Sequence, residues 1–355
     1  MIRSPKKMFI PGPTEVHPDV LTAMTHYQIG HRTQEMRDLV KRVKPGLRTL
    51  FGTRGDVFLS TSSATCVMEG ALTNLVKTKL LALECGAWSQ KWADTAQPNG
   101  IALERQIVPW GKAHDPDDVR KALKTGAYDT VTLVWCETST GVLNPLADIA
   151  KVVREFDDVM LCVDAVSALA AVPIDVDALG IDVCLAGTQK AMAMPPGLGV
   201  FSCSERALKR AASKPQRGYY MDFLQFKKNG DNDETPSTPT TAHIFALEAA
   251  LGRIHGETME KRAERHRRMA KLTQDWAREH LAIFSDPAHL SPSVTCIANA
   301  GKIDVDAFAK QLDARGFILG DGYGKLKNTT FRIGHFGEHT VDDVTRLLAA
   351  MTEAL

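Results

Sequence analysis

Runs of consecutive apolar residues alternate with stretches of three- and four-residue apolar spacing through the first 200 positions of the chain. The unbroken runs are typical of strands that are covered on both faces of a sheet. The spaced pattern indicates amphipathic helices, of which residues 36–51 are a clear example. The strands predicted in this way cover residues 56–60, 79–84, 130–135, 159–163, 181–186 and 198–201. Strands that alternate with helices predict an α/β fold.

The second half of the chain has a different pattern. Residues 243–280 show helical spacing throughout and predict one long helix. Residues 320–327, with the sequence GDGYGKLK, predict a flexible glycine-rich loop. The remaining elements expected here are strands at 293–298 and 330–333 and helices at 305–315 and 341–355.

The length of 355 residues exceeds what one simple core usually organises, so two domains are expected. An N-terminal arm over residues 1–15 is rich in turn residues and leads into a large domain over 16–255. A smaller domain of mixed helices and strands is expected over 256–355.

The composition is that of an ordinary globular protein. Hydrophobic residues make up 44% and charged residues 24%, and the formal net charge of +1 creates no overall field that favours nucleic acid or an anionic membrane. The basic cluster at 261–268 includes acidic residues in a helical pattern and is interpreted as a solvated helix face. No apolar run approaches the ~18 residues that span a bilayer, and the first residues lack a signal-peptide core. We expect a cytoplasmic protein.

The cysteines and histidines predict neither disulfides nor a metal site. The 7 cysteines are an odd number without a CxxC pair, and Cys136, Cys162, Cys184 and Cys203 lie in apolar runs. They are typical of small core residues in a reducing compartment. The histidines show no HExxH motif, so no metal is expected.

Two ionisable residues come at the ends of predicted strands. Asp164 closes the run 159–163, and Lys190 follows the run 181–186 after Gly-Thr-Gln. A structural ion pair, or two solvated residues, is the ordinary interpretation of such a pair. The small and soft residues at 191–194 leave room for a bulky aromatic ligand, which is the alternative.

A hydroxyl-rich loop at 61–65 follows the first of these strands and opens a helix. Free backbone N–H groups and the positive end of the helix dipole make such a loop a natural anion cradle. Serine and threonine are also ordinary helix caps, so the loop alone does not identify a site. Neither GxxxxGK[ST] nor GxGxxG is present, which argues against a nucleotide P-loop or a dinucleotide site.

Four short motifs together resemble one enzyme family. They are VDAVSA at 163–168, AGTQKAMAMPPG at 186–197, ETSTG at 137–141 and FRIG at 331–334. These motifs are similar to those of the pyridoxal-phosphate (PLP) enzymes of the class V aminotransferase family, in the branch of alanine–glyoxylate and serine–pyruvate aminotransferases. The resemblance implies PLP as cofactor and the type I fold of PLP enzymes. That fold has a large domain with a mixed, mostly parallel sheet and a smaller C-terminal α+β domain.

The resemblance also implies a role for each matched residue. In the family, the lysine that matches Lys190 holds the cofactor as a Schiff base and later moves a proton, and the aspartate that matches Asp164 keeps the pyridine nitrogen protonated. An aromatic residue at the place of Trp88 stacks on the ring. The whole set implied at the cofactor is Ser63, Ala64, Thr65, Trp88, Thr138, Asp164, Val166, Gln189, Lys190 and Thr238.

The substrate and a second subunit also follow from the resemblance. Arg332 matches the arginine that clamps the substrate α-carboxylate, for which a planar fork suits bidentate binding. Gly12 belongs with Trp88 to the inferred substrate wall. Thr238 matches a threonine that reaches the PLP phosphate of the neighbouring subunit, which implies a homodimer with shared active sites. Some members have a phosphate-binding tyrosine where this chain has Thr235, so that contact is left open.

The expected reaction is a ping-pong transamination between an amino acid and a 2-oxo acid. The matched residues contain no second arginine for a distal carboxylate, so we expect alanine or serine as donor and glyoxylate or pyruvate as acceptor. Aspartate stays an alternative donor, because Lys325 or Lys327 of the loop, or His31 or Arg32 of the partner subunit, would be able to bind its far carboxylate. A lyase or cysteine desulfurase and a non-catalytic relative are further alternatives. Residues 316–332 contain no cysteine, which disfavours the desulfurase.

Overall fold

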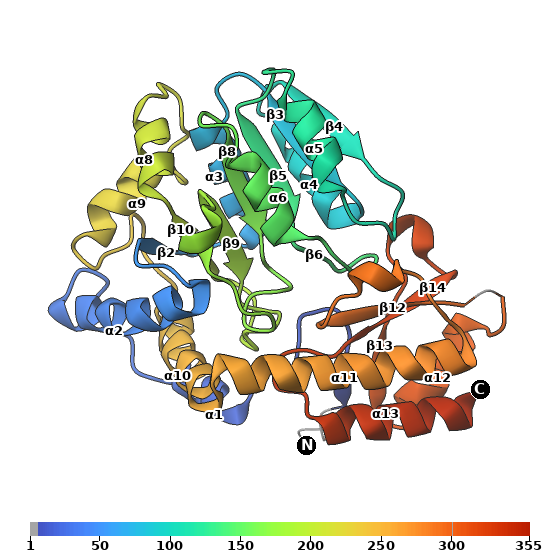
Figure 1. The fold of residues 1–355 in the computed structure, drawn as a ribbon. Coiled ribbons are helices and arrows are strands. Elements are labelled where there is room, and N and C mark those ends of the chain that lie inside the picture. Colours follow the sequence, from blue (N-terminus) through green and yellow to red (C-terminus); the bar gives the residue numbers. More distant parts are fainter. Residues whose placement is uncertain (1–5, 300) are drawn as a thin grey trace.

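The computed structural model describes residues 6–299 and 301–355, and a seven-stranded sheet lies at its centre (Figure 1). The strand order is β2 (Asp56–Ser60), β10 (Gly199–Cys203), β9 (Val183–Gly187), β8 (Met160–Asp164), β5 (Thr130–Val134), β3 (Leu80–Glu84) and β4 (Leu103–Ile107). Strand β10 is antiparallel to β2 and β9, and the other neighbours are parallel. The predicted α/β fold with a mixed, mostly parallel sheet is therefore confirmed.

Helices cover both faces of this sheet, which explains why its strands are apolar at consecutive positions. Along β8, Leu161 and Val163 face one core and Cys162 faces the other. One face packs against α2 (Gln34–Phe51), α5 (Pro116–Leu123), α6 (Leu146–Val153) and α10 (Thr241–Glu257). The other packs against α3 (Ala64–Leu75), α4 (Ala87–Ala96), α8 (Glu205–Ala212) and α9 (Phe223–Gly230). The short helices α1 (Pro18–Ala23) and α7 (Val176–Leu179) complete this part.

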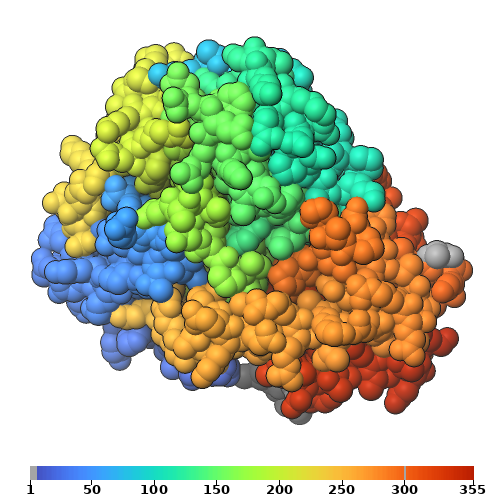
Figure 2. Space-filling view, in the orientation of Figure 1, coloured from blue at the N-terminus to red at the C-terminus, as the bar shows by residue number. Residues whose placement is uncertain are grey.

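A second sheet of five strands forms the part of the molecule that carries both chain ends. Its order is β1 (Lys7–Phe9), β13 (Phe317–Asp321), β14 (Thr330–Gly334), β12 (Val294–Ala298) and β11 (Ala282–Ile283). The helices α11 (Met259–His280), α12 (Val305–Ala314) and α13 (Val341–Ala354) enclose its core. In the space-filling view, the orange and red C-terminal part packs directly against the green and teal part that carries the large sheet (Figure 2). Smaller elements are β6 (Cys136–Glu137), β7 (Val142–Leu143), and the 3₁₀ turns η1 (Pro287–His289) and η2 (Gly324–Leu326).

One edge of the small sheet differs from the sequence expectation. Residues 7–9 of the expected arm form β1, which pairs in parallel with β13. Strand β13 itself takes in the first two residues of the predicted flexible loop. The strand begins with an apolar run, but Gly320 contributes no side chain to the pattern and obscures where the strand ends. The domain limits at residues 15 and 255 stay predictions.

The prediction of one long helix over 243–280 is wrong. The chain breaks at Thr258, whose φ of +67° and ψ of 146° lie outside the helical region, and α10 and α11 leave it in different directions (Figure 1). The break is needed because α10 packs on the large sheet and α11 on the small one. Thr258 then caps α11, since its hydroxyl accepts a hydrogen bond from the Lys261 N–H at 3.4 Å.

The basic cluster at the start of α11 is solvated at Lys261, Arg267 and Arg268, as expected, but Arg262 lies on the buried side of the helix. Arg262 is 1% exposed and forms ion pairs with Glu257 at 2.8 Å and Glu338 at 3.3 Å. Its guanidinium also donates to the carbonyls of Ala170 and Ala191, both at the edge of the large sheet. This arginine therefore connects α11 to the segment that follows Lys190. Among the described residues, none of the helices is both long and apolar enough to span a membrane.

Candidate active site

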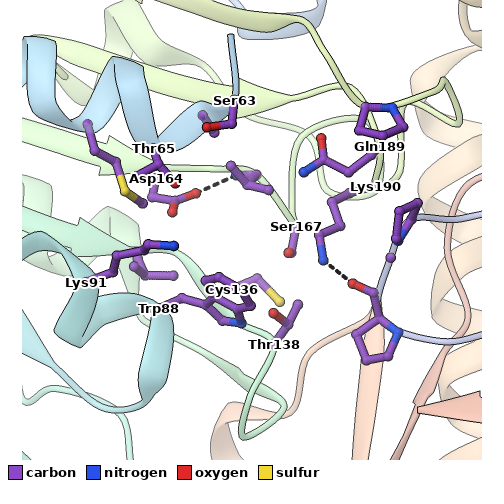
Figure 3. Close-up of a pocket in the computed structure, with 18 of the residues that line it drawn as sticks. Ser63, Thr65, Trp88, Lys91, Cys136, Thr138, Asp164, Ser167, Gln189 and Lys190 are labelled. Atoms are coloured by element: carbon purple, nitrogen blue, oxygen red, sulfur yellow. Dashed lines mark hydrogen bonds between the residues drawn. The ribbon is translucent and has the colours of Figure 1, made fainter. Parts of the chain in front are cut away.

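A cavity of about 370 Å³ lies where the carboxyl ends of β5, β8 and β9 face the small sheet. Open α/β sheets bind ligands at this edge. Figure 3 shows Asp164 and Lys190 on opposite sides of the cavity, with Ser63 above them and Trp88 below. The predicted site residues that line it are Gly12, Ser63, Ala64, Thr65, Trp88, Thr138, Asp164, Val166, Gln189, Lys190 and Arg332. The fold thus brings together every predicted site residue except Thr238.

The amine of Lys190 enters the cavity from the turn after β9. The residue is buried, and its Nζ donates a hydrogen bond to the carbonyl of Pro11. Burial lowers the pKa of Lys190 to about 8, the charge of Arg332 adds to this shift, and Asp164 opposes it. A lysine in this position has a usable fraction of neutral amine near neutral pH, which attack on a carbonyl requires.

Asp164 ends β8 on the other side of the cavity. Its Oδ1 accepts a hydrogen bond from the Val166 N–H at 2.7 Å. Burial raises the pKa of Asp164 to about 7 in spite of this bond, and the charge of Glu137 adds to the rise. A buried carboxylate without a cation is costly, so a protonated ring nitrogen beside Asp164 would stabilise its charged form.

The start of α3 forms an anion-binding end of the cavity. Ser63 is the N-cap residue, but its side chain makes no capping hydrogen bond, so the first N–H groups of the helix lack a side-chain partner. Ala64 and Thr65 follow it along the cavity wall. Backbone N–H groups and the helix dipole at this point suit a phosphate.

The remaining wall suits a flat aromatic ring. Trp88 lies in the first turn of α4, and its Nε1 is buried without a hydrogen-bond partner among the described residues. Val166 adds an aliphatic side chain and Thr138 a hydroxyl group. The amine, acid, anion cradle and ring walls together fit the size and chemistry of PLP.

Arg332 comes from β14 and closes the cavity from the small sheet. Its Nε donates to the carbonyl of Asp321 at 2.8 Å, and its Nη1 donates to that of Thr138 at 3.2 Å. These two bonds hold the guanidinium in place. Among the described residues no carboxylate pairs with it, so its outer N–H groups can receive an anionic ligand.

Among the cavity residues that the sequence prediction missed, three carry reactive or aromatic side chains: Lys91, Tyr323 and Cys136. Lys91 lies one turn after Trp88 on α4, and this helical spacing is the signal that would have identified it. The ring of Tyr323 lies 5.3 Å from that of Trp88 and 5.5 Å from Cζ of Arg332. Cys136 contributes its thiol, which lies 3.0 Å from the hydroxyl of Ser291.

Thr238 lies outside the cavity, on the exposed segment before α10. Arg32 holds this segment by donating to Glu234 at 2.9 Å and to the carbonyl of Thr235 at 3.0 Å. The two segments predicted to lie near a partner's site are therefore neighbours on the surface of this chain.

One histidine pair, His335 and His339, has the HxxxH spacing that helical metal sites use. The structure gives each another partner: Nε2 of His335 lies 2.9 Å from the hydroxyl of Thr295, and Nε2 of His339 donates to the carbonyl of Met8 at 3.0 Å. Across residues 6–299 and 301–355, no group of three or more His, Cys, Asp or Glu side chains is placed to hold a metal ion.

Comparison with known proteins gives one consistent family. The aminotransferase class-V model matches residues 8–332. The chain is 34% identical over 357 residues to an uncharacterized aminotransferase of Methanocaldococcus jannaschii, which covers 99% of this chain and 92% of the relative. It is 31% identical over 359 residues to the alanine–glyoxylate aminotransferase of Oryctolagus cuniculus, with 97% and 91% covered. A solved aspartate aminotransferase of Thermus thermophilus matches with a TM-score of 0.91 at 28% identity and 98% coverage of both chains. The chain therefore belongs to the class V aminotransferases, which are PLP-dependent enzymes.

Proposed function

We propose that this aminotransferase transfers the amino group of alanine or serine to a small 2-oxo acid such as glyoxylate or pyruvate. The observation that carries the proposal is the lining of the cavity. Arg332 is the one arginine among the described residues that line it, and it faces the side that carries Lys190. One guanidinium binds one carboxylate, which would be the α-carboxylate of the donor. Among the described lining residues no second arginine is left to bind a distal carboxylate.

The roles of the chain's own groups follow from their chemistry. Arg332 would bind the α-carboxylate and so orient the Cα–H bond toward Lys190. Lys190 would take the Cα proton and then deliver it to the neighbouring carbon of the cofactor, because its lowered pKa makes both protonation states accessible. Bound PLP supplies an electron-accepting ring for the charge that the proton leaves behind, and Asp164 would keep that ring cationic.

Borohydride reduction followed by peptide mapping tests the role of Lys190. The pyridoxyl group is expected on Lys190, and a Lys190→Ala protein should remain folded but carry no covalent cofactor. The group on another lysine would refute the assignment. Lys91 is the critical comparison, since it also lines the cavity.

Aspartate is a second candidate donor, and two lysines favour it. Lys91 lines the cavity, and Lys325 lies at its mouth with Nζ 4.4 Å from the ring centroid of Trp110. Neither lysine forms an ion pair with the described carboxylates. A distal carboxylate would therefore find a cation on the side of Tyr323. The name of the Thermus relative agrees with this candidate, and that of the mammalian relative agrees with alanine.

Half-reaction kinetics with alanine, serine, aspartate and glutamate distinguish the two candidates. The small-donor proposal expects the highest kcat/KM for alanine or serine, with little change in Lys91→Gln or Lys325→Ala. A higher kcat/KM for aspartate that falls in either variant would replace it with the aspartate reaction. Lys209→Gln is a matched control, because Lys209 is an exposed helical lysine on α8 far from the cavity.

The desulfurase alternative gains little from Cys136. This thiol lines the cavity, but burial raises the pKa of Cys136 to about 11, so it stays protonated near neutral pH. It is also held between the hydroxyls of Ser291 and Ser293 at 3.0 and 3.3 Å.

The non-catalytic alternative is tested by the colour of the purified protein. A yellow cofactor band that borohydride bleaches would dispose of it.

We also propose a homodimer in which the surface around Thr238 approaches the partner's cavity. Thr238 is exposed, and Arg32 orders the segment before it through Glu234 and Thr235. Light scattering should give twice the mass of the chain. A fully active monomer would contradict the proposal. The cytoplasmic location stays a prediction.

A further inference from the structure

The carboxylate of Glu137 is fully buried next to the cavity and surrounded by neutral donors. Its Oε2 lies 2.8 Å from the Ser89 N–H nitrogen, 3.0 Å from the Ser89 hydroxyl and 3.1 Å from the Trp88 nitrogen. Its Oε1 accepts from the Ser139 hydroxyl at 2.6 Å and from the Ser139 N–H at 3.1 Å. No described lysine or arginine forms an ion pair with Glu137, so the hydrogen bonds from these neutral donors stabilise its charge directly, while Lys190 and Arg332 act on it only from a distance.

Two of these donors belong to the first turn of α4, where the helix cannot satisfy its own N–H groups. The preceding residue, Gly86, has no side chain with which to cap them. Glu137 caps the helix from β6 instead and places a negative charge at the positive end of the helix dipole. A Cβ on Gly86 would lie 2.5 Å from Cδ of Glu137 and 2.6 Å from Oγ of Ser139. The φ of Gly86 is 175°, so space and not backbone angle requires glycine here.

The same carboxylate connects two walls of the cavity without lining it. On one side it holds the backbone of Trp88, whose indole faces the cavity. On the other side Thr138 follows it directly, and the carbonyl of Thr138 accepts a hydrogen bond from Arg332 at 3.2 Å. A shift of Glu137 would therefore displace both Trp88 and the backbone of Thr138, which holds Arg332.

We propose that Glu137 is a positioning residue: from strand β6 it caps helix α4 and so fixes the indole of Trp88 against the cofactor ring. The inference rests on the proposed stacking role of Trp88. A buried acid with a purely structural role would affect unfolding when replaced, but it would leave the affinity and the orientation of PLP unchanged.

Glu137→Gln in the full chain tests this difference. Glutamine keeps the size but turns one acceptor oxygen into an N–H donor that faces other donors. We expect apoprotein to bind PLP at least about tenfold more weakly, which corresponds to about 1.4 kcal/mol. The visible circular dichroism of bound PLP should also fall, and the amides of Trp88 and Ser89 should exchange hydrogen faster in the apoprotein. Ser139→Ala removes one donor and should give a smaller change of the same kind.

Glu84→Gln is the matched control. Glu84 is also buried and ends β3 two residues before Gly86, but its carboxylate pairs with Arg105 at 3.4 Å and makes no hydrogen bond to the first turn of α4 among the described residues. This variant should lower the urea midpoint while PLP affinity and circular dichroism stay at the wild-type level. Wild-type affinity and dichroism in Glu137→Gln would overturn the inference, and so would an equal loss in both variants.

A double-mutant cycle with Trp88→Ala separates this inference from the proposed function. If Glu137 acts through the indole, Glu137→Gln should weaken PLP binding much less in the Trp88→Ala background than in the wild type. Independent, additive effects would refute the positioning role while the stacking role of Trp88 survives. Unchanged PLP binding in Trp88→Ala alone would refute the stacking role, and the inference with it.

Discussion

Replacing Gly12 with alanine should misplace Lys190, because the two residues are in direct contact. Gly12 has a φ of +102°, a conformation that residues with a side chain rarely adopt. A Cβ at this position would lie 2.5 Å from Cδ and 2.7 Å from Nζ of Lys190. The substitution therefore adds backbone strain and a steric clash at the proposed Schiff-base lysine.

The size of the effect follows from these two terms. The left-handed backbone costs an alanine about 1–3 kcal/mol of folding free energy. Ordinary carbon contacts begin at about 3.5 Å, so Lys190 has to move by about 1 Å to accept the new methyl group. A displacement of about 1 Å costs a reaction about 10²-fold in rate when geometry is critical. We expect kcat to fall by about that factor, with a loss of stability of a few kcal/mol.

Gly126→Ala is the matched control for backbone strain alone. Gly126 has a φ of +69°, and a Cβ there meets nothing within 4 Å. This variant should lose about 1 kcal/mol in urea unfolding while its kcat and its visible cofactor spectrum stay unchanged. Single-turnover kinetics and the spectrum of Gly12→Ala give the comparison. Wild-type kcat in Gly12→Ala would refute the reasoning, because it would mean that Lys190 tolerates the displacement.

Two further predictions concern the acid and the arginine of the site. Burial raises the pKa of Asp164 from 3.8 to about 7, so its contribution to apoprotein stability is full below pH 3.8 and is lost as the pH rises through 7. Asp164→Asn apoprotein should therefore gain stability relative to wild type between pH 4 and 7, by on the order of a few kcal/mol, while holding PLP more weakly. Urea unfolding with the same pH slope in both proteins would contradict this. Arg332→Lys should lower kcat/KM for every amino donor by about 10- to 100-fold, because it loses the bidentate fork but keeps the charge. PLP affinity should not change, and an unaltered kcat/KM would argue against the clamp.

Local sequence was sufficient to identify the residues of the site that come from single motifs. Asp164 and Lys190 each end or follow an apolar run, and the carboxyl ends of neighbouring parallel strands meet at one edge of a sheet. Lys91 and Tyr323 escaped prediction for different reasons. Lys91 enters the cavity through the direction of α4, and Tyr323 through the pairing of β13 with β14. The helical spacing from Trp88 would have pointed to Lys91, but the orientation of Tyr323 depends on strands that pair only in the folded chain.

The break at Thr258 shows the same limit for helices. Apolar spacing continues across residues 243–280, because both α10 and α11 need a buried stripe. The two stripes face different sheets, and only the packing of those sheets decides that the chain must turn between them. The burial of Arg262 has the same origin, since its partners Glu257 and Glu338 approach it only after α11 has docked.

By itself, the sequence determined the alternation of strands and helices that builds the large sheet and the motifs that match class V aminotransferases. These features depend on apolar periodicity and on short stretches of chain, and such local preferences act before distant segments meet. Tertiary structure alone decided that β1 joins the C-terminal sheet and brings Gly12 against Lys190. It also decided that Glu137 caps a helix that begins 50 residues earlier in the chain. These contacts join segments far apart in sequence, and their energies depend on space and burial that no local pattern records.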